Sequence, residues 1–101
     1  MAPDLYRYVF NPEVPLEEVE GCLVLALFAV ESLHGEGDMR LDAAHFFDAD
    51  KRACVIDAGT AVGRDLCRLF TGFLSREFGA DAFRVERVDP AARRQPKEIH
   101  A

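Results

Sequence analysis

Residues 57–64 of this chain, Asp-Ala-Gly-Thr-Ala-Val-Gly-Arg, are the segment best suited to bind a charged ligand. They join a predicted strand to a predicted helix, and the first backbone N–H groups of a helix have no partner within it and attract anions. The hydroxyl of Thr60 and the guanidinium of Arg64 could converge on the same anion. We therefore interpret Gly59, Thr60, Gly63 and Arg64 as a candidate anion-binding site.

The same residues also have a structural interpretation. Thr60 is a favourable helix N-cap, and the two glycines permit a tight turn and close packing of the helix. The Gly-Lys-Ser/Thr sequence of a phosphate-binding P-loop is absent, and Asp57 adds a negative charge beside the site. We expect the structural role, with anion binding as the alternative.

Histidine, cysteine and serine residues lack the spacings that catalytic and metal sites require. No two cysteines form a Cys-x-x-Cys pair, and no serine has a histidine at helical spacing. The residues concerned are His34, His45, His100, Cys22, Cys54, Cys67, Ser32 and Ser75. The cysteines lie in apolar stretches and are odd in number, which predicts reduced, buried thiols. The sequence thus predicts no metal, no cofactor and no catalytic residue.

Charge and composition narrow the class of partner. The formal net charge is −6 at pH 7, which opposes attraction to nucleic-acid backbones and anionic membranes. The longest apolar run, residues 22–30, is shorter than the roughly 20 residues that span a bilayer. The N-terminus lacks the basic and apolar regions of a signal peptide. We expect a cytoplasmic protein that binds neither nucleic acid nor membrane.

Periodicity and breaker residues predict the order strand, helix, hairpin, helix, strand. The expected strands cover residues 5–10, 39–47, 52–57 and 83–88, and the expected helices cover residues 15–34 and 60–78. Residues 90–101 are polar and aperiodic, which predicts a flexible C-terminal tail. Residues 1–89 are then one α+β domain.

Two βαβ units with right-handed crossovers predict a ferredoxin-like βαββαβ sandwich. This fold is a four-stranded antiparallel sheet in the order 4-1-3-2 with two helices on one face. The strand phases direct Tyr6, Tyr8 and Phe10 towards the helices. They direct charged side chains to the outer sheet face, namely Arg7, Arg40, Asp42, Arg84 and Glu86.

The helix predicted over residues 15–34 has apolar residues on the side that its charged residues predict to face solvent. Val24 and Phe28 fall in its polar arc with Gly21 beside them. Leaving both side chains in water would forgo about 1.5–3 kcal/mol each, so we expect something to cover them. The cover is either a docked partner or the chain itself, through a helix tilt or the tail near Ile99.

The acidic residues of this helix restrict how it can pair with a second copy. Antiparallel pairing with itself would bring Glu17 and Glu20 towards Glu31, and like charges repel. A homodimer that sets this helix against Arg64 and Arg68, or a separate basic partner, avoids the repulsion.

These observations favour a non-catalytic cytoplasmic domain that acts by protein–protein association, as a homo-oligomer or an accessory subunit. The predicted partner-binding residues are Gly21, Val24 and Phe28. One alternative is a small-ligand or anion sensor that uses the start of the second long helix.

A second alternative is a small enzyme that resembles the dimeric α+β barrel monooxygenases. In that case Tyr6, Tyr8 or His45 would lie near a cavity. The charged outer sheet face opposes this resemblance, because those dimers bury that face.

Overall fold

The computed structural model describes residues 4–88 as an α+β domain with a four-stranded antiparallel sheet and three α-helices. The elements in chain order are β1 (Leu5–Phe10), α1 (Leu16–His34), α2 (Glu36–Asp42), β2 (His45–Asp48), β3 (Ala53–Asp57), α3 (Ala61–Phe78), a 3₁₀ turn η1 (Ala80–Ala82) and β4 (Phe83–Val88). The predicted tail, and any cover that Ile99 gives the first helix, lie outside the described residues.

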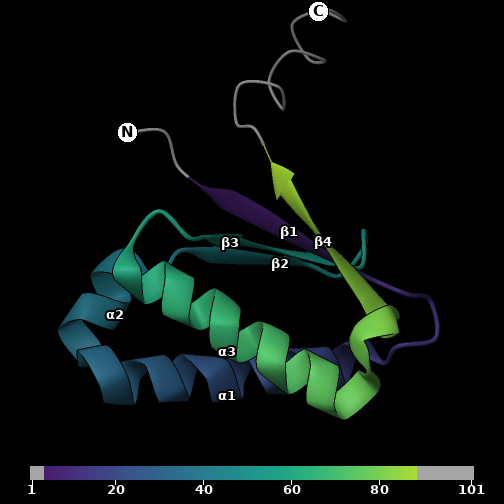
Figure 1. The fold of residues 1–101 in the computed structure, drawn as a ribbon, viewed down its shortest axis with the longest axis horizontal. Helices are drawn as coiled ribbons and strands as arrows, with labels where there is room; N and C mark the ends of the chain where they lie inside the picture. The colour runs from purple at the N-terminus through teal and green to yellow at the C-terminus, as the bar shows by residue number, and fades with distance from the viewer. Residues whose placement is uncertain (1–3, 89–101) are drawn as a thin grey trace, which may run out of the picture.

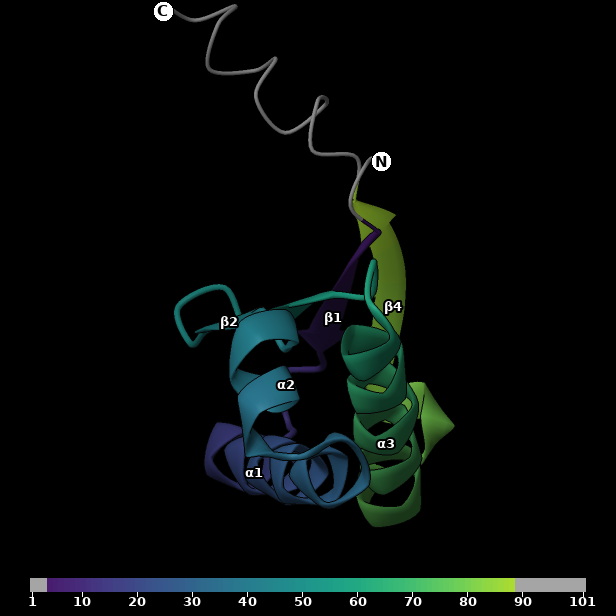
Figure 2. The same ribbon diagram turned by 90° about the vertical axis from the view of Figure 1, so that its left-hand side faces the viewer.

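The strands lie in the order β2-β3-β1-β4, so β1 and β3 are central. Each neighbouring pair is antiparallel, and Tyr8 of β1 lies opposite Cys54 of β3 and Val85 of β4. Figure 1 shows α1 and α3 side by side below the sheet, running in opposite directions, and Figure 2 shows the same layers from the end. The sheet therefore has one helix-covered face and one outer face.

The strand predicted over residues 39–47 is wrong in its first part, where the chain forms α2. Gly35, at φ 90°, ends α1 by donating its N–H to the carbonyl of Glu31 at 2.8 Å. The next turn has Glu36 near its N-terminus, and the Glu36 carboxylate accepts a bond from Arg40 at 3.0 Å. The alternation of residues 39–43 therefore did not identify a strand, and the exposed Glu36–Arg40 pair at i and i+4 adds a small stabilisation to the helix.

This correction also removes two residues from the outer sheet face. Arg40 and Asp42 belong to α2, so they do not share a sheet face with Arg7. Strand β2 is reduced to four residues, of which Phe47 stacks on Phe10 with ring centroids 6.4 Å apart. The hairpin therefore presents a short edge strand.

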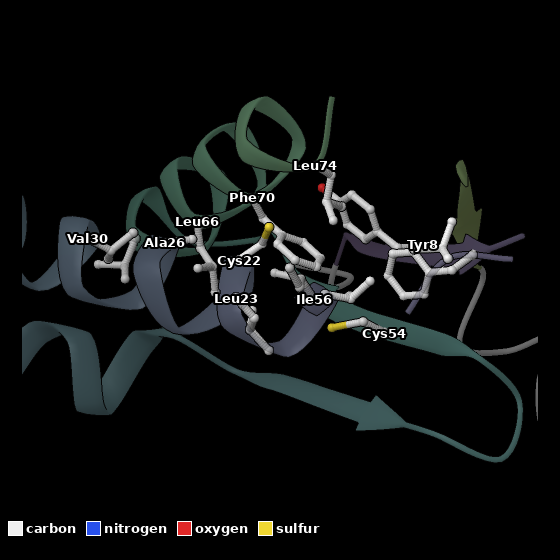
Figure 3. Close-up of a cluster of buried hydrophobic side chains, with 14 residues drawn as sticks. Tyr8, Cys22, Leu23, Ala26, Val30, Cys54, Ile56, Leu66, Phe70 and Leu74 are labelled. Atoms are coloured by element: carbon white, nitrogen blue, oxygen red, sulfur yellow. The ribbon is translucent and has the colours of Figure 1, made fainter. Parts of the chain in front are cut away.

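The core lies between the helices and the two central strands (Figure 3). Tyr8 is its centre, with its ring centroid 4.9 Å from that of Phe70. The Tyr8 hydroxyl donates to the carbonyl of Cys67 at 3.2 Å and shares a hydrogen bond with the Thr71 hydroxyl at 2.8 Å. A buried phenol satisfied by α3 fixes how that helix lies on β1.

Arg52 ties the β2–β3 hairpin to the loop that starts α1. Its backbone has φ 51°, in the left-handed region that a non-glycine residue rarely adopts. Its guanidinium donates to the carbonyl of Asn11 at 2.7 Å and to that of Val14. These bonds to charged nitrogen hold the start of α1 against the hairpin.

Burial keeps the ionisable groups of the core neutral. Desolvation raises the pKa of Tyr8 well above its ordinary value of 10.0, and it raises the pKa of Cys54 from 9.0 to about 12. The unfolded chain therefore releases these protons at a lower pH than the folded chain. The stability that their burial supplies is complete below about pH 9 and is lost as the pH rises towards the folded values.

We expect the free energy of unfolding to fall progressively above about pH 9, measured by urea unfolding at a series of pH values. Tyr6→Phe would leave Tyr8 as the chain's one tyrosine, because the sequence has two. Phenolate absorbance in that variant should then appear together with loss of circular dichroism. Ionisation of Tyr8 while the helices persist would contradict its assignment to the core.

Candidate functional site

The start of α3 is held by hydrogen bonds to the chain's own backbone. The Thr60 hydroxyl oxygen accepts from the N–H of Gly63 at 2.9 Å, and the hydroxyl donates to the carbonyl of Asp42 at 3.0 Å. The Asp57 carboxylate accepts from the N–H of Gly59 at 2.8 Å. Two of the N–H groups expected to face an anion thus have partners already, and one partner is a carboxylate that repels anions.

Gly63 has a steric reason to be glycine. It is buried, and a Cβ at this position would lie 1.9 Å from the carbonyl oxygen of Asp57. The first turn of α3 therefore packs directly on the end of β3, and Arg64 next to it is exposed. These contacts account for Gly59, Thr60 and Gly63 as structural residues, and anion binding here stays a prediction that none of the described bonds requires.

The outward face of α1 carries an apolar stripe. Val24 is 46% exposed, Leu25 57% and Phe28 62%, whereas the opposite side of the helix is buried. Gly21 has open space beyond it, since no atom lies within 4 Å of an added Cβ. Their spacing places the four on adjacent turns of one face. We call Gly21, Val24, Leu25 and Phe28 the α1 stripe.

Sequence reasoning found three of these four residues and missed Leu25. Its position on the helical wheel is at the border of the polar arc, so periodicity did not single it out. The packing of α1 against α3 and the sheet decides otherwise, because it buries Val19, Cys22, Leu23, Ala26 and Val30.

Acidic side chains surround the α1 stripe. Glu17 and Glu20 are exposed near its N-terminal end, and Glu31 is partly exposed near its C-terminal end. At that end His34 Nε2 lies 2.7 Å from Asp65 Oδ2 and joins α1 to α3. The stripe is therefore an apolar surface with an acidic margin.

A groove of about 450 Å³ runs between α3 and the edge strand β4. It is lined by Tyr6, Tyr8, Cys67, Arg68, Thr71, Gly72 and Val85. Val85 is 43% exposed there, so the helix-side face of β4 is uncovered at Val85, whereas Phe83 on the same face packs against the core. Of the three residues predicted near a cavity in the enzyme hypothesis, Tyr6 and Tyr8 line this groove, and His45 lines a separate hollow with Phe46 and Leu5.

The outer sheet face combines charged and apolar side chains. Arg7 lies opposite Glu86 and Val55 in the sheet register, and Arg84 bonds Glu86 at 2.8 Å. Phe46 of β2 is 63% exposed on the same face. The face thus carries the predicted charges of β1 and β4 together with one large exposed aromatic side chain.

Within residues 4–88, no three histidine, cysteine or acidic side chains gather closely enough to hold a metal ion. None of the described helices has the length and apolar character needed to cross a bilayer. Comparison with known proteins gave no significant match to any family model, curated protein or solved structure.

We expect Gly63→Ala to lower the free energy of unfolding by at least about 2 kcal/mol, because the new methyl group would overlap the Asp57 carbonyl. Gly72→Ala is the matched control in the same helix, since nothing lies within 4 Å of its added Cβ. That change should stabilise by up to about 1 kcal/mol through helix propensity. Urea unfolding of both variants measures the difference, and equal effects would refute the close approach of α3 to β3.

Proposed function

We propose that this protein acts by protein–protein association through the α1 stripe, as a homo-oligomer or an accessory subunit and without catalysis. The observation that supports this most directly is the exposure of Val24 and Phe28 on one helix face. A single exposed apolar residue is ordinary, but contiguous ones at helical spacing are typical of a docking surface.

The free energy gained by burying these side chains also supports association. Burying a valine or phenylalanine side chain contributes about 1.5–3 kcal/mol, so a partner that covers Val24 and Phe28 gains a substantial part of its binding free energy from them. Gly21 would let a partner helix approach the backbone of α1 closely. The acidic margin would select a partner with basic residues around its apolar contact.

We propose that the fold is a ferredoxin-like sandwich with α2 as an addition before the hairpin. The observed order β2-β3-β1-β4, taken from the β4 edge, runs 4-1-3-2. We also propose a cytoplasmic location, supported by Cys22, Cys54 and Cys67, which are all free thiols.

We expect Phe28→Asp to abolish association or to raise its dissociation constant by at least about 30-fold, as loss of a buried aromatic anchor does. Phe46→Asp is the matched control, because Phe46 is 63% exposed and Phe28 62%. Sedimentation and light scattering across a dilution series would give the mass of each variant.

The pair of variants separates two surfaces. Loss of association in Phe28→Asp alone supports the α1 stripe. Loss in Phe46→Asp alone would instead identify the outer sheet face as the interface, as the resemblance to α+β barrel dimers implies, and would refute the proposal.

A further inference from the structure

We infer that the partner of the α1 stripe is a second copy of this chain, whose α3–β4 groove receives Phe28. This inference rests on the proposed association through α1 and adds the identity of the partner surface. Each copy would then supply one stripe and one groove to a closed two-fold dimer.

The two surfaces are both apolar and both accessible. Phe28 projects from α1 with 62% of its surface exposed, and the groove offers about 450 Å³ between α3 and β4. Tyr6 lines the groove and is partly exposed, so its ring is available to stack on an incoming aromatic side chain, whereas Tyr8 is buried. Gly72 lies at the groove with open space beyond it, so a helix can approach α3 closely there.

The two surfaces are also complementary in charge. Acidic residues flank the α1 stripe, while the exposed side of α3 carries Arg64, Arg68 and Arg76 and one partly exposed acid, Asp65. The Arg68 side chain is 78% exposed and lies 3.6 Å from Asp65, a long ion pair that leaves its guanidinium accessible. The acidic margin of the α1 stripe against the exposed arginines of α3 steers the two copies together.

Symmetry restricts how two copies can place their helix layers face to face. The helices α1 and α3 are antiparallel neighbours (Figure 1). A two-fold axis that lies in the interface perpendicular to the helices would pair each helix with its own copy. Glu20 would then lie near Glu31, and arginine near arginine. A two-fold axis along the helices pairs α1 with α3 of the other copy, antiparallel, and places acids near arginines. The charge pattern therefore selects the second axis.

Antiparallel pairing then sets the register. With Phe28 beside Gly72 of the other copy, one turn forward along α1 reaches Glu31, and one turn back along α3 reaches Arg68. The steps cover about 4.5 Å along α1 and about 6 Å along α3. Glu31 of each copy would thus pair with Arg68 of the other, twice in the dimer.

A first experiment fills the groove. Gly72→Leu should raise the dimer dissociation constant by at least about 30-fold, because its side chain would occupy the space assigned to Phe28. Its Cβ meets no atom within 4 Å, so the variant should keep the wild-type circular dichroism and be at least as stable to urea as the wild type. Gly72→Ala is the control and should remain a dimer. Analytical ultracentrifugation of the full chain measures all three.

A second experiment exchanges the charges. Arg68→Glu and Glu31→Arg should each weaken the dimer by about tenfold, because each change places two like charges together at two sites. The double variant should recover most of the wild-type affinity. Arg40→Glu, on α2, is the charge control and should leave the dissociation constant unchanged, because Arg40 is exposed and belongs to neither the α1 stripe nor the lining of the groove.

The outcomes distinguish the inference from the proposed function. A wild-type chain that stays monomeric at all concentrations overturns the second copy as partner. A dimer that Phe28→Asp dissociates but Gly72→Leu and the charge changes leave intact overturns the groove while the α1 stripe stands. A dimer that survives Phe28→Asp refutes both. Loss in Gly72→Leu with recovery in the double charge variant supports the groove and its register.

Discussion

The structure depends on a mismatch between one helix and a two-layer fold. The central part of α1 is apolar on nearly all sides, yet a helix that lies on a sheet beside one other helix can bury only one side of itself. That side holds Val19, Ala26 and Val30, none of which is accessible to solvent. The residues opposite, above all Phe28, remain in water. In this molecule the core and the candidate interface are therefore two sides of the same helix, and the acidic residues along α1 limit what can cover the second side.

The position of α3 determines which part of the sheet stays accessible. Its first turn contacts the end of β3 at Gly63, where any side chain would overlap the Asp57 carbonyl, and its middle is held to β1 by the hydroxyl of Tyr8. These two contacts, one near each central strand, leave β4 uncovered at Val85. An edge strand with an accessible helix-side face and a helix with an exposed basic side together form the groove. The groove is therefore the space beside α3 that stays open because α3 is held against β3 and β1.

Much of the fold could be predicted because its signals are local. Caps, glycines after helices and prolines between elements set the limits of α1, α3 and β4 to within a residue or two of those observed. The strand predicted over residues 39–47 was wrong in its first part, because a short segment with apolar residues at alternate positions cannot be told from a short helix by periodicity alone. The candidate residues of α1 could be predicted for the same reason. The helical wheel places Gly21, Val24 and Phe28 within the polar arc, whereas the exposure of Leu25 depends on where the sheet and α3 lie.

The sequence by itself determined the identity and order of most elements, the acidic character of α1 and the excess of apolar residues on it, because periodicity, capping and charge are properties of neighbouring residues. Only the tertiary structure decided which apolar residues stay exposed and that Tyr6, Tyr8 and Gly72 meet at one groove. It also showed that Gly63 is a packing residue. The physical reason is that burial and steric exclusion depend on residues distant in the chain, and the contact of α3 with β3 and β1 brings those residues together.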